Sequence, residues 1–279
     1  MANILKTGIL MTVLTVLFVW LGGALGGRQG AVMAFAVAAG MNFFAYFFSD
    51  KLVLKRYRAR EVDASSEPRL VSIVSELAHT AGMPMPKVYV LPDRSPNAFA
   101  TGRSPRHAAV AATEGILALL DDDELAGVMG HELAHVKHRD ILTGTIAATV
   151  AGAIAMMGRF AMYSGRSRRS GSNPVALVLA AIGAPIAAMV IRMAISRTRE
   201  YAAAPGGAEI SGQPNGLAEA LEKNSNAGRQ GILQNLNSAH AHMFIANPLQ
   251  GVRGLSQLFS THPPMEERVR RLRAMAAGG

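Results

Sequence analysis

Two histidines four residues apart, His131 and His135, lie in the middle of this 279-residue chain, with Glu132 beside the first. Residues four apart share one face of an α-helix, so both imidazoles can direct a nitrogen to one metal ion. Zn²⁺ held this way activates water, and a carboxylate next to the first ligand can accept the proton of that water. The pattern therefore predicts a hydrolytic zinc centre with Glu132 as general base. The alternative is a surface helix that carries two histidines by chance.

A catalytic zinc ion needs a third protein ligand, which must come from elsewhere in the chain. His138 shares the face of His131, but seven residues rise about 10.5 Å along a helix, so one ion cannot be bound by both. The residues alone leave the third ligand open. The candidates are Glu200, Glu209, His240, His242 and His262.

The composition predicts a membrane protein with one soluble domain. Half of the residues are hydrophobic, 17% are charged, and the mean hydropathy is +0.21. The chain has no cysteine, which excludes disulfides and thiolate metal sites. The net charge of +9 would suit nucleic acid or an anionic membrane. Because much of this charge flanks apolar runs, we expect a lipid bilayer as partner and no nucleic acid.

Two apolar runs near the start, residues 9–25 and 31–48, each approach the roughly 20 residues that cross a bilayer. Only residues 26–30 separate them, so they predict a tight helical hairpin. A cleaved signal peptide is the alternative for the first run, but a second apolar run follows at once. Residues 141–157 and 175–195 are also apolar, which gives about four transmembrane helices.

Five cations between Lys51 and Arg60 follow the first hairpin directly. Such a cluster marks the cytoplasmic side of a span, so the domain after it is expected in the cytoplasm. Arg166, Arg168 and Arg169 conflict with this orientation, because a second crossing hairpin would place them outside. Either the second pair does not fully cross or the first cluster dominates, and we favour crossing.

The remaining segments predict an α+β fold that is predominantly helical. Hydrophobic periodicity indicates helices at residues 68–81, 121–139, 215–224 and 264–275, and strands at 87–91, 97–102 and 107–113. The expected organisation is a transmembrane hairpin (1–50), a first part of the soluble domain (51–140), a second hairpin (141–195) and a second part of the soluble domain (196–279).

Four ordered motifs, PNAFATGR, HELAHVKHRDIL, SRTREYAAA and STHPPMEERVRRL, resemble the HtpX-type membrane zinc metalloproteases, distant relatives of the CaaX prenyl proteases. The resemblance implies a zincin-like domain with one Zn²⁺ per chain, held by His131, His135 and Glu200. It also implies an edge strand at Asn97 and Ala98 that binds an extended substrate. Its further implications are a bacterial inner membrane location, a cytoplasmic active site and C-terminus, and clearance of damaged or misfolded membrane proteins under stress.

One position departs from the family pattern. Where the family has an aspartate four residues after the glutamate ligand, this chain has Ala204, followed by Pro205. The aspartate would be expected to orient a histidine ligand, and the proline to end or kink the helix beyond Glu200. The rival interpretation is therefore a non-catalytic membrane adaptor that keeps the fold. His262 either donates to the developing oxyanion or packs in a turn.

Overall fold

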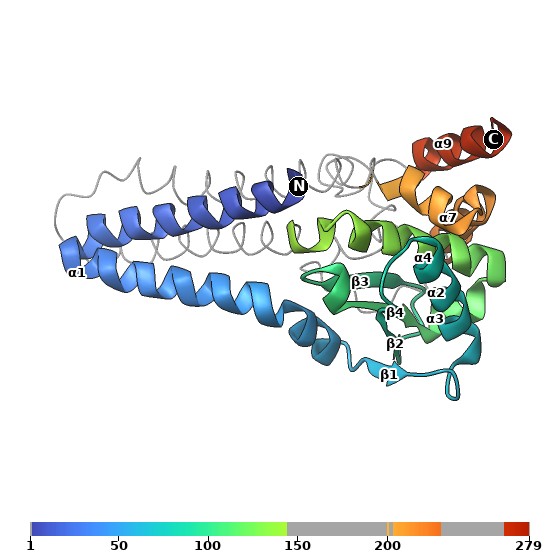
Figure 1. The fold of residues 1–279 in the computed structure, drawn as a ribbon, viewed down its shortest axis with the longest axis horizontal. Helices are drawn as coiled ribbons and strands as arrows, with labels where there is room; N and C mark the ends of the chain where they lie inside the picture. Colours follow the sequence, from blue (N-terminus) through green and yellow to red (C-terminus); the bar gives the residue numbers. More distant parts are fainter. Residues whose placement is uncertain (1, 144–199, 201–202, 230–264, 279) are drawn as a thin grey trace. The chain divides into compact units, whose positions relative to one another are not determined.

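The computed structural model describes residues 2–143, 200, 203–229 and 265–278 (Figure 1). The chain divides into two compact units, one of Met1–Phe47 with Thr143–Ile195 and one of Phe48–Leu142 with Ser196–Gly279. The predicted fourth apolar segment and most of the third lie outside the described residues. The count of four spans is therefore not confirmed, and the predicted domain boundaries stay a prediction.

Helix α1 (Ala2–Arg56) folds back on itself as the predicted hairpin (Figure 1). Asn42 Nδ2 donates to Thr15 Oγ1 at 3.0 Å, although 27 residues of straight helix would separate them by about 40 Å. The turn lies at Gly27, whose φ of 60° suits glycine. Gly22 and Gly30 make the arms approach closely, since a Cβ on Gly22 would lie 2.4 Å from the Gly30 carbonyl oxygen.

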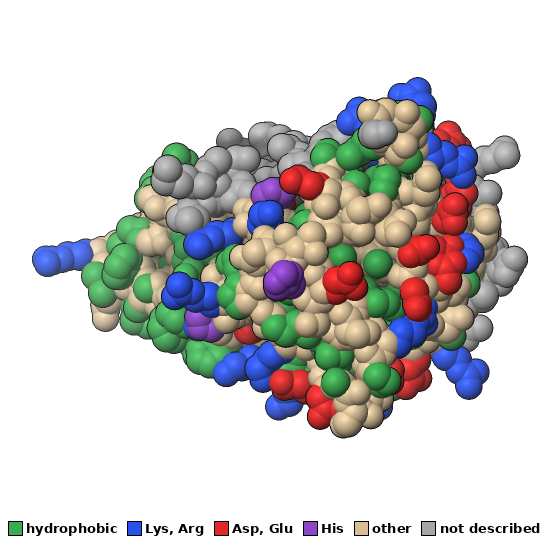
Figure 2. Space-filling view, turned by 45° about the vertical axis from the view of Figure 1, so that its right-hand side comes forward, with side chains coloured by type: hydrophobic (Ala, Val, Ile, Leu, Met, Phe, Trp, Pro, Cys, Tyr) green, Lys and Arg blue, Asp and Glu red, His purple; other side chains and the backbone are tan. Residues whose placement is uncertain are grey.

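The surface of α1 is apolar. Trp20 is 68% exposed and Met33 is 64% exposed, and Figure 2 shows hydrophobic side chains on the visible part of this hairpin, whereas charged side chains gather over the second unit. Within the described residues, Gly27–Phe48 is the one helix long and apolar enough to cross a membrane, and Thr7–Trp20 is shorter. A lipid environment suits such a surface, because exposed apolar patches of this extent are unusual on soluble proteins.

The second unit contains a four-stranded sheet in the order β1-β2-β4-β3. The three predicted strands are confirmed as β2 (Lys87–Leu91), β3 (Ala98–Gly102) and β4 (Ala108–Thr113), and a short β1 (Arg60–Val62) was not predicted. β2 and β4 are parallel, whereas the β1–β2 and β3–β4 pairs are antiparallel. β3 is thus an edge strand of the sheet.

The two faces of the sheet are covered by different helices. Ala98 and Ala100 of β3 belong to the main core with α2 (Pro68–Thr80) and α4 (Asp122–Lys137). Phe99 points to the opposite face, where it packs with Leu54 at the end of α1. Its ring centroid lies 5.9 Å from that of Tyr57. The period of two in a strand explains this alternation.

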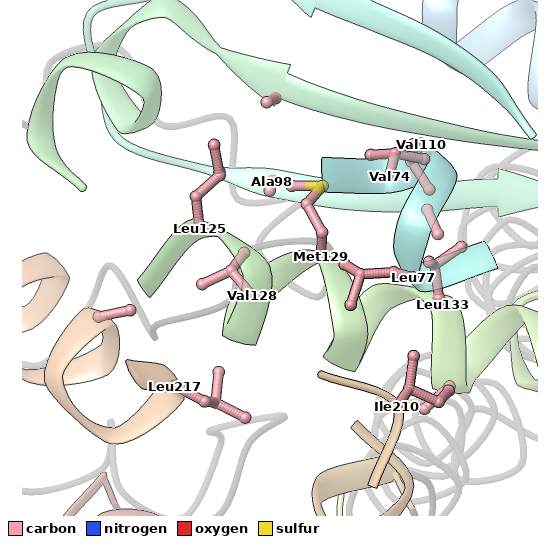
Figure 3. Packing of buried hydrophobic residues seen from close by; sticks show 14 of the residues in the cluster. Val74, Leu77, Ala98, Val110, Leu125, Val128, Met129, Leu133, Ile210 and Leu217 are labelled. Atoms are coloured by element: carbon pink, nitrogen blue, oxygen red, sulfur yellow. The ribbon is translucent and has the colours of Figure 1, made fainter. Parts of the chain in front are cut away.

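Helix α4 carries the histidine pair and is buried along most of its length. It begins with a capping box, in which Asp121 accepts from the Glu124 N–H at 3.0 Å and Glu124 accepts from the Asp121 N–H at 2.9 Å. Figure 3 shows the side chains along this helix between the sheet with α2 on one side and Ile210 and Leu217 on the other. The short α3 (Glu114–Leu119) connects β4 to α4. Burial on both sides fixes the rotation of α4 about its axis.

The other side of α4 is covered by α7 (Pro214–Arg229), against which α9 (Met265–Ala277) packs, and by the helical residues 203–211. Pro205 does not end the helix, since the backbone is helical over 203–211; the alternative expectation of a kink just beyond Glu200 involves residues 201–202, which lie outside the described residues. Gly207 lets this helix approach α4, because a Cβ there would lie 2.7 Å from His131 Cα. The close approach brings Glu200 to the histidine pair.

We predict that Gly207→Ala destabilises the protein by about 1–3 kcal/mol, because its methyl group overlaps the α4 backbone. Gly206→Ala is the matched control, since its Cβ would meet only side-chain atoms, the nearest at 3.1 Å. Denaturant unfolding of the metal-free protein in detergent measures both changes. Equal stability of the two variants would contradict the close helix contact.

Candidate metal centre

The structure brings together the three predicted ligands. Nε2 of His131 and Nε2 of His135 lie 3.2 Å apart. Glu200 Oε2 lies 3.5 Å from His131 Nε2, and Glu200 Oε1 lies 3.4 Å from His135 Nε2. His131 is 2% exposed and Glu200 is 7% exposed. Three buried groups with lone pairs thus converge on one point.

These distances match a tetrahedral metal site. With ligands at about 2.1 Å from a zinc ion, two ligand atoms of a tetrahedron lie about 3.4 Å apart. Here the two imidazole nitrogens lie 3.2 Å apart, and each has one of the two Glu200 oxygens at 3.4–3.5 Å. Two imidazoles and one carboxylate are also a ligand set that catalytic zinc uses, with one position left for water. The residues present therefore fit zinc.

The other candidates for the third ligand are not at this point. Glu209 is exposed on the helix of residues 203–211, and His138 caps the end of α4. His240, His242 and His262 lie outside the described residues. Within the described part of the chain, His131, His135 and Glu200 form the one group of three such side chains spaced to hold a metal ion.

Glu132 is held beside the ligands by the edge strand. Its Oε2 accepts a hydrogen bond from the Ala100 N–H at 2.9 Å. Burial raises the pKa of Glu132 to about 7, although the positive charge of His135 acts in the opposite direction. A carboxylate with a pKa near neutrality is suited to take up and release a proton at physiological pH.

Asp140 orients His135, and the sequence analysis missed it. Its Oδ2 lies 3.4 Å from His135 Nδ1, and Asp140 is 2% exposed. Burial alone would lower the pKa of His135, but hydrogen bonds to Asp140 and Glu200 outweigh it and raise the pKa to about 9. The metal-free site therefore holds a proton on His135, which a bound metal ion must replace.

The pKa of His131 is shifted in the opposite direction to that of His135. Burial lowers the pKa of His131 to about 4, although a hydrogen bond to the Glu200 carboxylate acts to raise it. Its buried Nδ1 has no hydrogen-bond partner within the described residues. Ala204 lies about one helical turn from Gly207, and Gly207 faces His131. Position 204 is thus on the helix face toward His131, so the missing aspartate would serve His131 rather than His135.

Arg268 is a second residue that the sequence analysis missed. One of its terminal nitrogens lies 3.2 Å from Glu200 Oε2, and its side chain is 5% exposed. It comes from α9, far along the chain from the other site residues. Its signal in the sequence is a cation four residues before Leu272, the spacing of one helix face.

The predicted substrate-binding residues, Asn97 and Ala98, lie at the start of the edge strand and are buried. The Asn97 carbonyl accepts from the Thr113 N–H at 2.9 Å, so Asn97 faces β4. Because pairing alternates in an antiparallel ladder, the main-chain groups of Ala98 and Ala100 point away from β4. The outward Ala100 N–H that reaches Glu132 agrees with this alternation.

The similarity of this chain to known proteins agrees with the metal centre described above. Two curated relatives are each named "Protease HtpX homolog" and are each 56% identical to this chain. The one from Syntrophotalea carbinolica aligns over 98% of this chain and 99% of its own length, and the one from Methylibium petroleiphilum over 99% and 98%. The crystal structure of S. mikatae Ste24p has a similar fold, with a TM-score of 0.55 and 16% identity over 95% of this chain and 62% of that one.

The family model described as "Peptidase family M48" matches residues 64–276, which include every residue of the metal centre described above. This chain belongs to peptidase family M48.

Proposed function

We propose that this protein is a membrane-anchored zinc endopeptidase, with one Zn²⁺ per chain held by His131, His135 and Glu200. The observation that carries the proposal is the convergence of the two imidazoles and the Glu200 carboxylate, with contacts of 3.2–3.5 Å between them and Glu132 beside them. The names of the relatives favour a protease over the non-catalytic adaptor.

The residues around the site have separate roles in peptide hydrolysis. When bound, zinc supplies Lewis-acid chemistry that polarises a carbonyl and makes water more acidic. Glu132 accepts the proton of the attacking water and returns it to the departing amine. The Ala100 N–H holds one carboxylate oxygen of Glu132, which fixes the direction of the other. Asp140 keeps the His135 ring oriented.

An extended substrate adds to the sheet at β3 in this proposal. The outward main-chain groups of Ala98 and the outward carbonyl of Ala100 are the partners that an added strand requires. Main-chain pairing selects a flexible, extended segment rather than a particular side chain. This favours substrates that are unfolded or have unfolded locally.

The biological role that fits is degradation of damaged or misfolded membrane proteins during stress, on the cytoplasmic side of a bacterial inner membrane. The span Gly27–Phe48 supports a membrane anchor. The exposed cations Lys51, Lys55 and Arg56, which follow the span on the same helix, support the orientation. The specific role rests on the family resemblance.

Replacing Glu132 with Gln should lower the rate of casein cleavage by about 10²–10⁴-fold, because the general base is lost. Bound zinc should stay nearly unchanged, because Glu132 is not a ligand. Glu209→Gln is the matched control, since this exposed glutamate lies outside the site and its loss should change neither quantity. Near-normal turnover by the Glu132 variant would refute its role.

Single cysteines can test the orientation without background labelling, because the chain has no cysteine. Arg28→Cys, at the exposed turn of the hairpin, should react with an impermeant maleimide added outside spheroplasts. Ala64→Cys, exposed in the second unit, should react only after the membrane is opened. The reverse labelling pattern would contradict the cytoplasmic placement.

Ala204→Asp should tighten zinc binding by up to about 10–100-fold, because it offers His131 Nδ1 an acceptor and fixes the imidazole tautomer. Ala204→Asn, which keeps an acceptor oxygen without the charge, separates hydrogen bonding from simple attraction between charges. Pro205→Ala, alone and combined with Ala204→Asp, tests whether the proline affects placement. Unchanged affinity in all four variants would mean that another group already serves His131.

A further inference from the structure

We propose that Arg268 is a positioning residue that fixes the carboxylate of Glu200 for metal binding, so that the C-terminal helix α9 is part of the metal centre. The inference rests on the proposed zinc site and goes beyond it, because it assigns a function to a helix that contributes no ligand. The contact of 3.2 Å between the guanidinium and Glu200 Oε2 is its starting point.

Of the four arginines on α9, Arg268 is the buried one. The side chain of Arg268 is 5% exposed, whereas those of Arg270, Arg271 and Arg273 are 76%, 54% and 58% exposed. The exposed three pair with surface glutamates, namely Glu267 on α9 and Glu222 on α7. A buried arginine costs free energy unless its charge is compensated, and Glu200 provides that compensation.

The packing of α9 determines the direction in which the Arg268 side chain points. Val269 is 8% exposed and Leu272 is 1% exposed, and both belong to the core that also contains residues of α7 and α4. Arg268 and Leu272 are one turn apart on the same face of the helix. The apolar contacts of α9 therefore position the guanidinium at the site, as those of α4 position the imidazoles.

Glu200 needs an external partner because the last torsion of a glutamate side chain has only broad, shallow preferences. Its two oxygens face different neighbours, with Oε2 near Arg268 and His131 and Oε1 near His135. A planar guanidinium restrains the plane of a carboxylate better than an ammonium group does. Without it, the carboxylate can rotate away from the point where the imidazoles converge.

Two effects of Arg268 on a metal ion have opposite signs, which makes the proposal testable. As a mere neighbouring cation, Arg268 would repel Zn²⁺, and its removal would tighten binding. As a positioning residue, it orders a ligand, and its removal weakens binding. The direction of the change in affinity therefore distinguishes the two.

The experiment compares full-length Arg268→Gln, Arg268→Lys and the control Arg271→Gln, an exposed residue one turn away on the same helix. Zinc dissociation constants come from chelator competition, and the visible spectrum of the Co²⁺-loaded protein reports the coordination of the ion. We expect Arg268→Gln to weaken zinc binding by about 10–100-fold with an altered Co²⁺ spectrum. Arg268→Lys, which keeps the buried charge but not the planar fork, should give a smaller loss, and Arg271→Gln none.

Unchanged or tighter zinc binding by Arg268→Gln, while the unmodified protein binds zinc and cleaves casein, would overturn this inference and leave the proposed function intact. Failure of the unmodified protein to bind zinc would overturn both. If Arg268→Gln does not fold, Arg268→Lys decides the question: a loss of affinity with an altered spectrum supports positioning, and affinity equal to that of the unmodified protein refutes it.

Discussion

Burial of the Glu200 carboxylate against two imidazoles is the constraint on which the rest of this structure depends. Removing a carboxylate from water costs several kcal/mol unless cations or hydrogen bonds replace the water. Here Arg268 lies 3.2 Å away, and His135, whose pKa is raised to about 9, carries a proton in the metal-free state. Three helices must therefore meet closely, and the glycines at their crossings, such as Gly207 against His131, permit this.

The edge strand β3 connects the candidate metal centre to the rest of the second unit. Through Ala100, β3 holds Glu132 on one side, and through Phe99 it packs on the other side against Leu54 of α1 and Tyr57, which follows α1. A strand supported on both faces keeps its outer main-chain groups in fixed positions. This rigidity is what pairing with a flexible substrate requires, because the substrate then bears most of the ordering cost.

Local patterns predicted the parts of this site that depend on local geometry. The spacing of His131 and His135 fixes their common helix face, and alternation placed the three long strands correctly. The third ligand followed only from resemblance, because no local rule relates position 200 to α4. Asp140 lies beyond a break in the helix, where Arg139 has a φ of 58°, so its direction depends on the turn. Arg268 is one of four arginines on α9, and only the packing of α9 against α7 determines that it is the buried one.

The departure at position 204 leaves the three ligand groups together. The helix continues past Pro205, and Glu200 stays within 3.5 Å of both imidazole nitrogens. We infer that an aspartate there would offer an acceptor to His131 Nδ1, on the ring that burial already keeps neutral with a pKa of about 4. A neutral imidazole is the form that binds a metal ion, so His131 needs no aspartate to lose its charge. The aspartate would only select the tautomer with Nε2 free, and for this reason the geometry favours a working protease over an adaptor.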